Sequence, residues 1–422
     1  MTVLLLVATL ASLAQGHVRP RGAAVVVVSP AGPTRTIARA LELVAAGGRI
    51  VVRTGLYREP TILVSKPVQI IGDGHPVLDG EHARQIMSIT APDVTVRGLA
   101  FRNVGVAYTE DMAAIKVIET HGCVIEGNEV DDGFFGIYLQ GVTDCVVARN
   151  VLRGAHRDET HSGNGIQLWN STRIRILDNR ISGHRDGIYF EFAHGSTVSG
   201  NVSEGNVRYG LHFMYSDDCR YSHNVFRRNG SGVAVMYTKR VTMEDNLFAS
   251  NWGAAAYGLL LKEIADPVIV RNRFVHNTTG LVADGAMRII ARDNRFAENG
   301  WAVKLMSSTT NGSFTRNDFS GNTFDVSTNS RESENTFSGN YFDDYAGYDL
   351  NHDGFGDVPH HPVQLFSVIV ERNSPALILL RSVFVGLIET AERVLPSLTP
   401  TALADPHPAM RPMRAASPTR VP

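Results

Sequence analysis

The sequence predicts an all-β fold, a parallel β-helix, from a period of about 22 residues in which an Asn and a Gly recur at fixed places. Each repeat has a few apolar residues, then Asn-x-apolar, then Gly-apolar-x-apolar. The asparagines are Asn103, Asn128, Asn150, Asn179, Asn201, Asn224, Asn246, Asn272, Asn294, Asn317 and Asn340, and the glycines are Gly136, Gly187, Gly232 and Gly280, with Gly210 one place late. So short a period fits one coil of a solenoid, in which no coil buries a core alone.

The residues before each Asn alternate as in a strand with one buried face. In Ile174-Arg175-Ile176 and Val241-Thr242-Met243 the positions five and three before the Asn are apolar. The Asn continues this inward set, which predicts an internal ladder of side-chain amides at a bend. Eleven coils at roughly 4.8 Å spacing would give a rod about 50 Å long. A second inward stack is expected from Phe226, Phe248, Phe274, Phe296, Phe319 and Phe342.

Length, charge and the N-terminal segment narrow the class of protein. The chain has 422 residues, 19% of them charged, and a net charge of -2. This balance gives no basic footprint for nucleic acid. Residues 1–16 are typical of an export signal, because an apolar run too short to span a bilayer precedes Ser12-Leu13-Ala14. No Lys or Arg precedes that run, so the true start codon is open, and a buried first strand is the alternative.

The three cysteines do not make a disulfide scaffold. Cys123 and Cys145 both lie five residues before an Asn and are therefore expected to face inward on adjacent coils. Cys219 has the same phase on a later coil. We expect small core fillers, with a bridge between Cys123 and Cys145 in an oxidising compartment as the alternative.

Six segments are expected along the chain. Apolar residues at helical spacing within 34–46, before Gly47-Gly48, predict a short helix over the open N-terminal end of the solenoid. Residues 376–394 predict an amphipathic helix on a partner or a membrane surface, with capping of the far end as the alternative. The segments are 1–16, a signal peptide; 17–102, an N-terminal cap and irregular first coils; 103–345, the parallel β-helix; 346–362, an Asp-rich loop; 363–396, the C-terminal amphipathic helix region; and 397–422, a disordered tail.

Two coils carry insertions, within 153–163 and within 249–257. Both fall between the Asn and the Gly of their coil, so both loops are expected to leave the rod along one edge, about 19 Å apart. Insertions on a shared face often mark a binding face. The first loop holds His156 and His161, and the second holds Trp252 and Tyr257.

Between these loops, residues two and four places after each Gly are expected to face outward. This phase puts His212 and Met214 side by side on one exposed strand, with Met236 over Met214 on the next coil. An imidazole with two thioethers suits Cu(I) better than Ca²⁺ or Mg²⁺. His156 or His161 from the first loop are possible further ligands.

Exposed Met and aromatic residues also fit a docking patch for another protein, and this alternative stays open. The residues that would bind such a partner are Trp169, Tyr189, Glu191, Trp252 and Tyr257.

Residues 349–357 predict a calcium loop. Oxygen ligands stand at alternate positions before a Gly that allows a sharp turn. No Glu follows at the twelfth position, so the loop is not an EF-hand, and a plain Asx-turn loop is the alternative. The candidate ligands are Asp349, Asn351, Asp353 and Asp357.

Several motifs resemble the NosD family of maturation factors of nitrous oxide reductase, over about residues 24–399. They are Gly-Leu-His-Phe-Met-Tyr-Ser-Asp-Asp at 210–218, Gly-Val-Ala-Val-Met-Tyr at 232–237, Ala-Ala-Tyr-Gly-Leu-Leu-Leu-Lys at 255–262, Asn-Gly-Trp-Ala at 299–302 and Asp-Gly-Phe-Gly-Asp-Val-Pro at 353–359.

The resemblance implies a right-handed parallel β-helix in the periplasm, associated with the membrane subunit and ATPase of an ABC transporter. It implies that such a protein helps to supply copper, delivered by a lipoprotein copper chaperone, to the copper centres of the reductase. It assigns no ligand residues.

Many parallel β-helices are polysaccharide lyases, hydrolases or epimerases, which need an exposed acid/base pair along the groove. The outward positions offer Glu191 and Lys262, three coil steps apart. The sequence thus predicts no enzyme, and a pure docking scaffold remains a further alternative.

Overall fold

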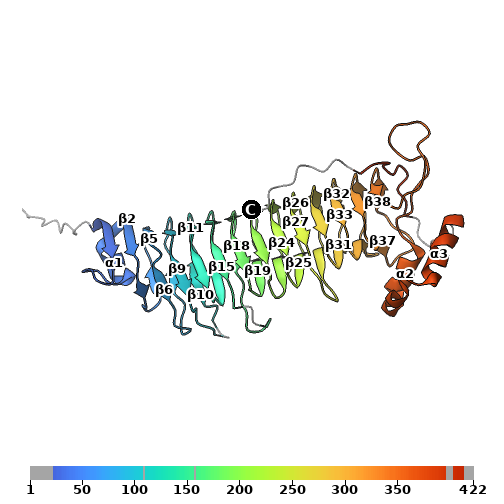
Figure 1. Cartoon of the computed structure of the whole chain (residues 1–422). Coiled ribbons are helices and arrows are strands. Elements are labelled where there is room, and N and C mark those ends of the chain that lie inside the picture. The colour runs from blue at the N-terminus through green and yellow to red at the C-terminus, as the bar shows by residue number, and fades with distance from the viewer. Residues whose placement is uncertain (1–21, 108–109, 156–157, 396–402, 413–422) are drawn as a thin grey trace, which may run out of the picture.

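The computed structural model describes residues 22–107, 110–155, 158–395 and 403–412. Its main body is a rod of stacked coils, with one helix at the N-terminal end and two at the C-terminal end (Figure 1). Nearly every coil adds one strand to each of three parallel sheets, called A, B and C below. The predicted all-β parallel β-helix is therefore confirmed.

Sheet A has 14 strands: β1 (Ala23–Val28), β2 (Val44–Arg53), β5 (Gln69–Asp73), β8 (Thr95–Arg97), β11 (Val124–Glu126), β14 (Val146–Ala148), β17 (Arg175–Leu177), β20 (Thr197–Ser199), β23 (Arg220–Ser222), β26 (Thr242–Glu244), β29 (Val268–Val270), β32 (Ile290–Arg292), β35 (Ser313–Thr315) and β38 (Thr336–Ser338). At the usual strand spacing this sheet is roughly 60 Å long. The rod exceeds the eleven coils counted from asparagines, because the coils within 23–102 stack in the same sheets without that Asn.

Sheet B has 13 strands: β3 (Leu56–Tyr57), β6 (Val77–Asp79), β9 (Ala100–Arg102), β12 (Glu129–Asp131), β15 (Val151–Arg153), β18 (Arg180–Ser182), β21 (Val202–Glu204), β24 (Val225–Arg227), β27 (Leu247–Ala249), β30 (Arg273–Val275), β33 (Arg295–Ala297), β36 (Asp318–Ser320) and β39 (Tyr341–Phe342). Sheet C has 12: β4 (Ile62–Val64), β7 (Met87–Ile89), β10 (Ala113–Ile118), β13 (Phe135–Gln140), β16 (Ile166–Trp169), β19 (Asp186–Glu191), β22 (Tyr209–Met214), β25 (Ser231–Met236), β28 (Tyr257–Lys262), β31 (Thr279–Asp284), β34 (Trp301–Leu305) and β37 (Phe324–Thr328).

The asparagine ladder lies at the bend between sheets A and B. From Asn128 to Asn340 the backbone N–H and the Nδ2 of each Asn donate to the Oδ1 of the next, for example 3.0 Å for both from Asn224 to Asn246. Nδ2 also donates to a carbonyl of a neighbouring coil, as Asn224 does to Val198. Asn103 was wrongly included. It has a φ of 54° and donates to Asp79, and Leu99 takes the inward place, its N–H donating to Asn128.

A second ladder, which the sequence analysis missed, lies at the bend between sheets B and C. Its rungs stand five residues after those of the first: Asn206, Asn229, Asn251, Asn277, Asn299 and Asn322. It begins at His184, whose backbone N–H donates to the Oδ1 of Asn206 at 3.1 Å. Two ladders thus bind the backbone donors that the bends would otherwise bury without an acceptor.

The predicted aromatic stack is present in the core. Neighbouring rings of Phe226, Phe248, Phe274, Phe296, Phe319 and Phe342 lie 4.7 to 5.6 Å apart and nearly parallel. Cys123 and Cys145 are buried free thiols on adjacent coils, and the N–H of Cys123 donates to Sγ of Cys145 at 2.9 Å. Cys219 is also free and buried. All three fill core positions.

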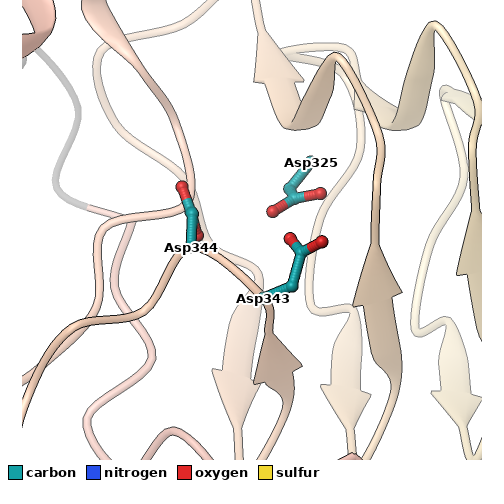
Figure 2. A group of neighbouring side chains, drawn as sticks. All are labelled: Asp325, Asp343 and Asp344. Atoms are coloured by element: carbon teal, nitrogen blue, oxygen red, sulfur yellow. The ribbon is translucent and has the colours of Figure 1, made fainter.

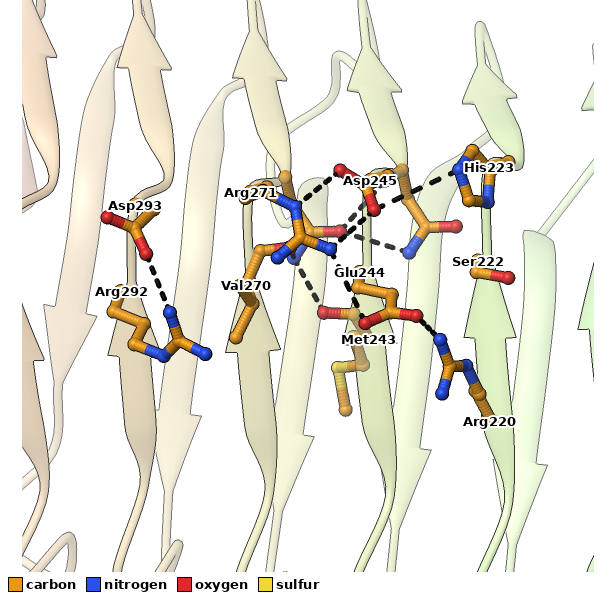
Figure 3. A network of polar contacts seen from close by, with 12 residues as sticks. Arg220, Ser222, His223, Met243, Glu244, Asp245, Val270, Arg271, Arg292 and Asp293 are labelled. Carbon is orange, nitrogen blue, oxygen red and sulfur yellow. Dashed lines mark hydrogen bonds and ion pairs between the residues drawn. The ribbon is translucent and has the colours of Figure 1, made fainter. Parts of the chain in front are cut away.

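Ion pairs link the coils on the outer side of the rod (Figure 3). Arg271 donates to both carboxylate oxygens of Asp245, at 2.9 and 2.7 Å, and Glu244 pairs with Arg220. Asp245 precedes a ladder Asn and has a φ of 54°, so the bend, the buried amide and the exposed ion pair occupy consecutive positions. Exposed pairs of this kind contribute little individually.

The helix α1 (Ile37–Leu43) covers the N-terminal end of the rod and buries Ile37, Ala40 and Leu41. Thr36 caps it, and the buried carboxylate of Glu59 accepts the N–H groups of Ile37 and Ala38. The helix is shorter than the predicted 34–46, because the chain from Val44 pairs with β1 as strand β2.

At the other end, the predicted helix over 376–394 is divided into a 3₁₀ turn (Ser374–Leu379) and α3 (Val383–Val394). A further helix, α2 (Leu365–Arg372), precedes them; it packs on β37, and α3 packs on it. No helix in the described ranges is long and apolar enough to cross a membrane. The predicted signal peptide lies outside the described residues.

The predicted disordered tail is wrong for residues 403–412, which fold back onto the end of the rod. Asp405 is fully buried, and its Oδ2 accepts the N–H and the Nδ2 of Asn340 at 2.9 and 2.8 Å. A carboxylate oxygen thereby serves as the acceptor for the last rung of the first ladder. The remainder of 397–422 lies outside the described residues.

Candidate functional site

Both insertions leave the rod between sheets B and C. The first joins β15 to β16, and the second joins β27 to β28. Both therefore border the outer face of sheet C, as the sequence predicted. A hollow of about 360 Å³ separates the second loop from α2 and is lined by Tyr257, Leu260, Trp301 and Leu377 among others.

The register of sheet C brings the predicted metal ligands together. Met214 pairs with Met236 across β22 and β25, and His212 lies two residues before Met214 on the same face. Both Met side chains are partly buried. The hydroxyl of Tyr189 lies 3.2 Å from the carboxylate of Glu191 and 3.6 Å from Sδ of Met214, and can donate its one proton to either. Burial raises the pKa of Tyr189 to about 12, with a further contribution from Glu191.

His212 is buried, which corrects the expectation of an exposed residue. Its side chain is 8% exposed, because the rings of Tyr189 and Tyr209 lie 5.0 and 4.8 Å from its own. Nδ1 lies 3.5 Å from a carboxylate oxygen of Asp186. Nε2 has no hydrogen-bond partner in the described part of the chain, which leaves a lone pair or a proton unused. The alternation of the strand placed the residue correctly outside the core but could not show what covers it.

Beside His212 lies an ion pair whose carboxylate is buried and whose guanidinium is partly exposed. Arg208 donates from Nε and Nη2 to the two oxygens of Asp186, at 2.9 and 2.5 Å, and Asp186 is fully buried. Burial alone would raise the pKa of Asp186, but the hydrogen bonds from Arg208 and His212 outweigh it and hold the pKa below its usual value. Arg208 also reaches Glu159 at 3.3 Å and thereby ties the first loop to sheet C.

The predicted partner-binding residues are spread along this face. Trp169 and Trp252 are exposed, whereas Tyr189, Glu191 and Tyr257 are half-buried. The ring of Tyr257 stacks on Tyr209 at 6.3 Å, so the second loop reaches the surroundings of His212.

The first insertion holds the two loop histidines, His156 and His161. His156 lies outside the described residues. His161 is half-exposed, and its Nδ1 lies 2.7 and 2.8 Å from the carboxylate oxygens of Asp158. Hydrogen bonds from Thr160 and His161 hold the pKa of Asp158 well below its usual value. No contact joins His161 to His212 in the described part of the chain; His161 lines a separate small cavity with His184.

The Asp-rich loop uses its side chains to bind its own backbone. Asp349 accepts the N–H groups of Asp353 and Gly354, Asp353 accepts that of Phe355, and Asp357 accepts that of Leu350. Asn351 also accepts the N–H of Asp353. The four predicted calcium ligands thus cap backbone N–H groups of their own loop, and among the described residues Asp349, Asp353 and Asp357 do not bring their carboxylate oxygens within 4.8 Å of one another.

A second acidic cluster lies at the end of the rod (Figure 2). The carboxylates of Asp325, Asp343 and Asp344 offer oxygens within 4.8 Å of one another. Burial, and secondarily the charge of Asp344, raises the pKa of Asp325 to about 8. Asp325 therefore holds a proton at neutral pH, which removes the repulsion between its carboxyl group and the carboxylates of Asp343 and Asp344.

Known proteins are similar to this chain over the segment that contains both insertions and the residues around His212. The family model described as "Periplasmic copper-binding protein (NosD)" matches residues 153–347. A protein of Pseudomonas aeruginosa named "Probable ABC transporter binding protein NosD" is 29% identical over 390 residues, 88% of this chain and 90% of that protein. One of the same name from Stutzerimonas stutzeri is 26% identical over 82% of this chain and 84% of its own length. The resemblance to the NosD family is confirmed.

The segment matched by the NosD family model contains both insertions, His184, His212, Met214 and Met236, whereas the Asp-rich loop and the C-terminal helices lie beyond it. Among solved structures, a family 28 exopolygalacturonase of Yersinia enterocolitica is similar with a TM-score of 0.53 and 11% identity, over 75% of this chain and 78% of that one. At that identity the likeness shows the fold alone.

Proposed function

We propose that the chain is a periplasmic accessory protein for the maturation of nitrous oxide reductase, which works with an ABC transporter to supply copper for the copper centres of the reductase. The observation that carries the proposal is the match of residues 153–347 to a family described as periplasmic and copper-binding. The relatives named as ABC transporter binding proteins, which align over most of the chain, support the transporter as a partner. A lipoprotein chaperone as donor and the ATPase subunit as partner belong to the same proposal.

His212, Met214 and Met236 are the residues proposed to hold Cu(I). They lie on adjacent coils of one face, and the free Nε2 of His212 is the nitrogen available to a metal. Two neutral thioethers and an imidazole bind Cu(I) without adding charge, which favours a site that releases its metal again. The hydroxyl of Tyr189 can donate to Glu191 in place of Met214 and so leave the sulfur free for a metal.

Replacing Met214 and Met236 together by Leu tests this assignment. The exchange preserves volume, so folding is expected to change by less than about 1.5 kcal/mol, and a hydrophobic docking contact would survive. We expect copper-poor reductase in cells that carry the double variant, with transporter binding unchanged. Copper-replete reductase from those cells would leave docking of a protein partner as the role of this face, through Trp169, Tyr189, Glu191, Trp252 and Tyr257.

The Asp-rich loop is proposed to bind Ca²⁺ in a structural role, separate from copper supply. Its carboxylate and amide side chains, at alternate positions before a glycine, supply hard oxygen ligands of the kind that Ca²⁺ takes, and binding would draw them together. A thermal unfolding midpoint that rises with added Ca²⁺, and no longer rises after Asp353→Ala, is the expected result. A midpoint indifferent to Ca²⁺ in the native chain would identify a plain Asx-turn loop.

A further inference from the structure

The second asparagine ladder stops at an imidazole. The backbone of His184 donates to Asn206 as a ladder residue does, but its side chain is not an amide. The residue is 1% exposed, and within the described ranges neither ring nitrogen makes a hydrogen bond of ordinary geometry, although the Gly163 carbonyl is close to the ring. A buried polar side chain without a well-formed hydrogen bond is rare in native proteins and points to an ion or a water molecule beside it.

A cavity opens where the ladder stops. The register of β15 with β18 sets residue 155 opposite His184, and the first insertion begins there. The cavity beneath the loop measures about 10 Å³, which is room for a single water molecule or ion. Its walls include His161, His184, Asp132, Ser162, Phe134 and Val104.

His161 has a carboxylate on one ring nitrogen, as metal-binding histidines commonly do. The carboxylate of Asp158, 2.7 Å from Nδ1, keeps the proton on that nitrogen and leaves the lone pair on Nε2. Metal-binding histidines commonly donate their second N–H to a carboxylate in this way. Because His161 is half-exposed, the cavity is accessible to an ion from solvent.

We infer that His161 and His184 form a Cu(I) site beneath the first insertion, distinct from His212, Met214 and Met236. The inference rests on the proposed function for the identity of the metal. Imidazole nitrogens suit both copper and zinc, but zinc sites in proteins are almost always four-coordinate. Cu(I) is stable with two nitrogen donors, and a one-ion cavity has space for little else.

The Gly163 carbonyl close to the ring of His184 also accepts the N–H of Arg185. The strand that follows, β19, pairs with β22, so this site lies one coil from His212 and Met214.

The test uses the full chain with Met214→Leu and Met236→Leu, so that thioether ligation is absent. This chain is loaded anaerobically with Cu(I) and titrated against bathocuproine disulfonate, a Cu(I) chelator. We expect one Cu(I) per chain and an X-ray absorption spectrum with nitrogen and no sulfur neighbours. Adding His184→Asn or His161→Gln is expected to weaken binding at least tenfold. His184→Asn installs the residue type of the ladder, so its thermal unfolding midpoint should match the parent.

If neither His184→Asn nor His161→Gln changes the affinity for Cu(I), the inferred site is wrong. It is also wrong if stoichiometric Zn²⁺ displaces the copper. If the native chain binds Cu(I) but the chain without Met214 and Met236 does not, the inference fails and the proposed function stands. If the native chain binds no Cu(I), the inference fails together with direct copper binding in the proposed function.

Discussion

At the scale of single residues, the ladder asparagines accept hydrogen bonds from buried backbone N–H groups, which no apolar side chain could. Each bend turns backbone N–H groups toward the interior, where a donor without an acceptor costs about 1–3 kcal/mol. Asn has an oxygen that accepts two donors from the preceding coil and an amide that donates to the following coil, as Asn246 and Asn272 do. The chain of bonds must end on an acceptor, and Asp405 provides it.

Asp405→Ala is expected to destabilise the C-terminal coils by about 2–4 kcal/mol, because it removes the acceptor of the N–H and Nδ2 of Asn340 and of the Gly339 N–H. Hydrogen exchange measured at β38 and β39 should rise. Asp405→Asn is the comparison variant: its single amide oxygen replaces Oδ2 as the acceptor for Asn340, whereas its NH₂ group cannot replace Oδ1 as the acceptor for Gly339, so exchange should rise less than in Asp405→Ala. Equal exchange in the two variants would contradict the role given to Asp405.

Asp325 predicts a pH dependence of stability. Its pKa is raised to about 8 in the folded chain, from an ordinary value of 3.8, so the folded state holds the proton more tightly than the unfolded state. The contribution of Asp325 to the free energy of unfolding is therefore fully present below about pH 4. It is lost as the pH rises toward 8, by an amount on the order of a few kcal/mol. Asp325→Asn keeps the acceptor for Asn322 and should remove this decline.

The measurement is the free energy of unfolding from pH 5 to pH 9, with EDTA present to exclude metal ions. The native chain should lose stability across this range relative to Asp325→Asn. Two parallel curves would mean that Asp325 is ionised in the folded chain at neutral pH.

At the scale of elements, α3 packs on α2 with one side and leaves an apolar side that no described residue covers. One side chain, Val385, is buried against α2, while Val383, Leu387 and Val394 are 82%, 64% and 73% exposed. An apolar helical face of this kind marks a surface for another protein or a membrane. Deleting everything after Pro375 would not test this cleanly, because it also removes Asp405.

Leu387→Ser with Val394→Ser is the cleaner test of α3. Both side chains are exposed, so folding should change by less than about 0.5 kcal/mol. We expect co-purification with the transporter membrane subunit to be lost. Leu63→Ser, at a residue 67% exposed near the opposite end of the rod, is the control and should leave co-purification intact. If the α3 variant still co-purifies, attachment lies on another surface.

The sequence predicted those elements that repeat. The inward phase of Asn128 to Asn340, the phenylalanine stack and the edge on which both insertions emerge all follow from the period. The burial of His212 did not, because alternation gives the direction of a side chain and not the loops that cover it. His184 was missed because it stands at the end of the second ladder, whose asparagines, five residues after those of the first, were not predicted either. Asp405 was missed because its contact spans 65 residues of chain in a segment of tail-like composition.

At the scale of the whole molecule, the rod is a one-dimensional stack in which each coil contacts its neighbours and every sheet has a single strand order. The distance between neighbouring coils sets the spacing of side chains that stack on the outer face, including Met214 and Met236. On sheet C this distance requires glycine at one position in successive coils. A Cβ added at Gly232 would lie 2.2 Å from the carbonyl oxygen of Gly258, so only glycine permits the coils to approach this closely.

Gly232→Ala is therefore expected to separate two coils locally, at a cost of about 2–4 kcal/mol, because backbone atoms must move to admit the methyl group. In a stack with nearest-neighbour coupling the damage stays near its origin. Hydrogen exchange should rise in β22, β25 and β28 and remain native in β5 and β8 near the N-terminal end. Gly253→Ala, in the second loop, meets only one side-chain carbon at 3.5 Å and is the matched control, expected to exchange like the native chain. Loss of protection along the entire rod in Gly232→Ala would instead mean that the coils fold as one cooperative unit, and that the spacing of the methionines depends on coils far from them.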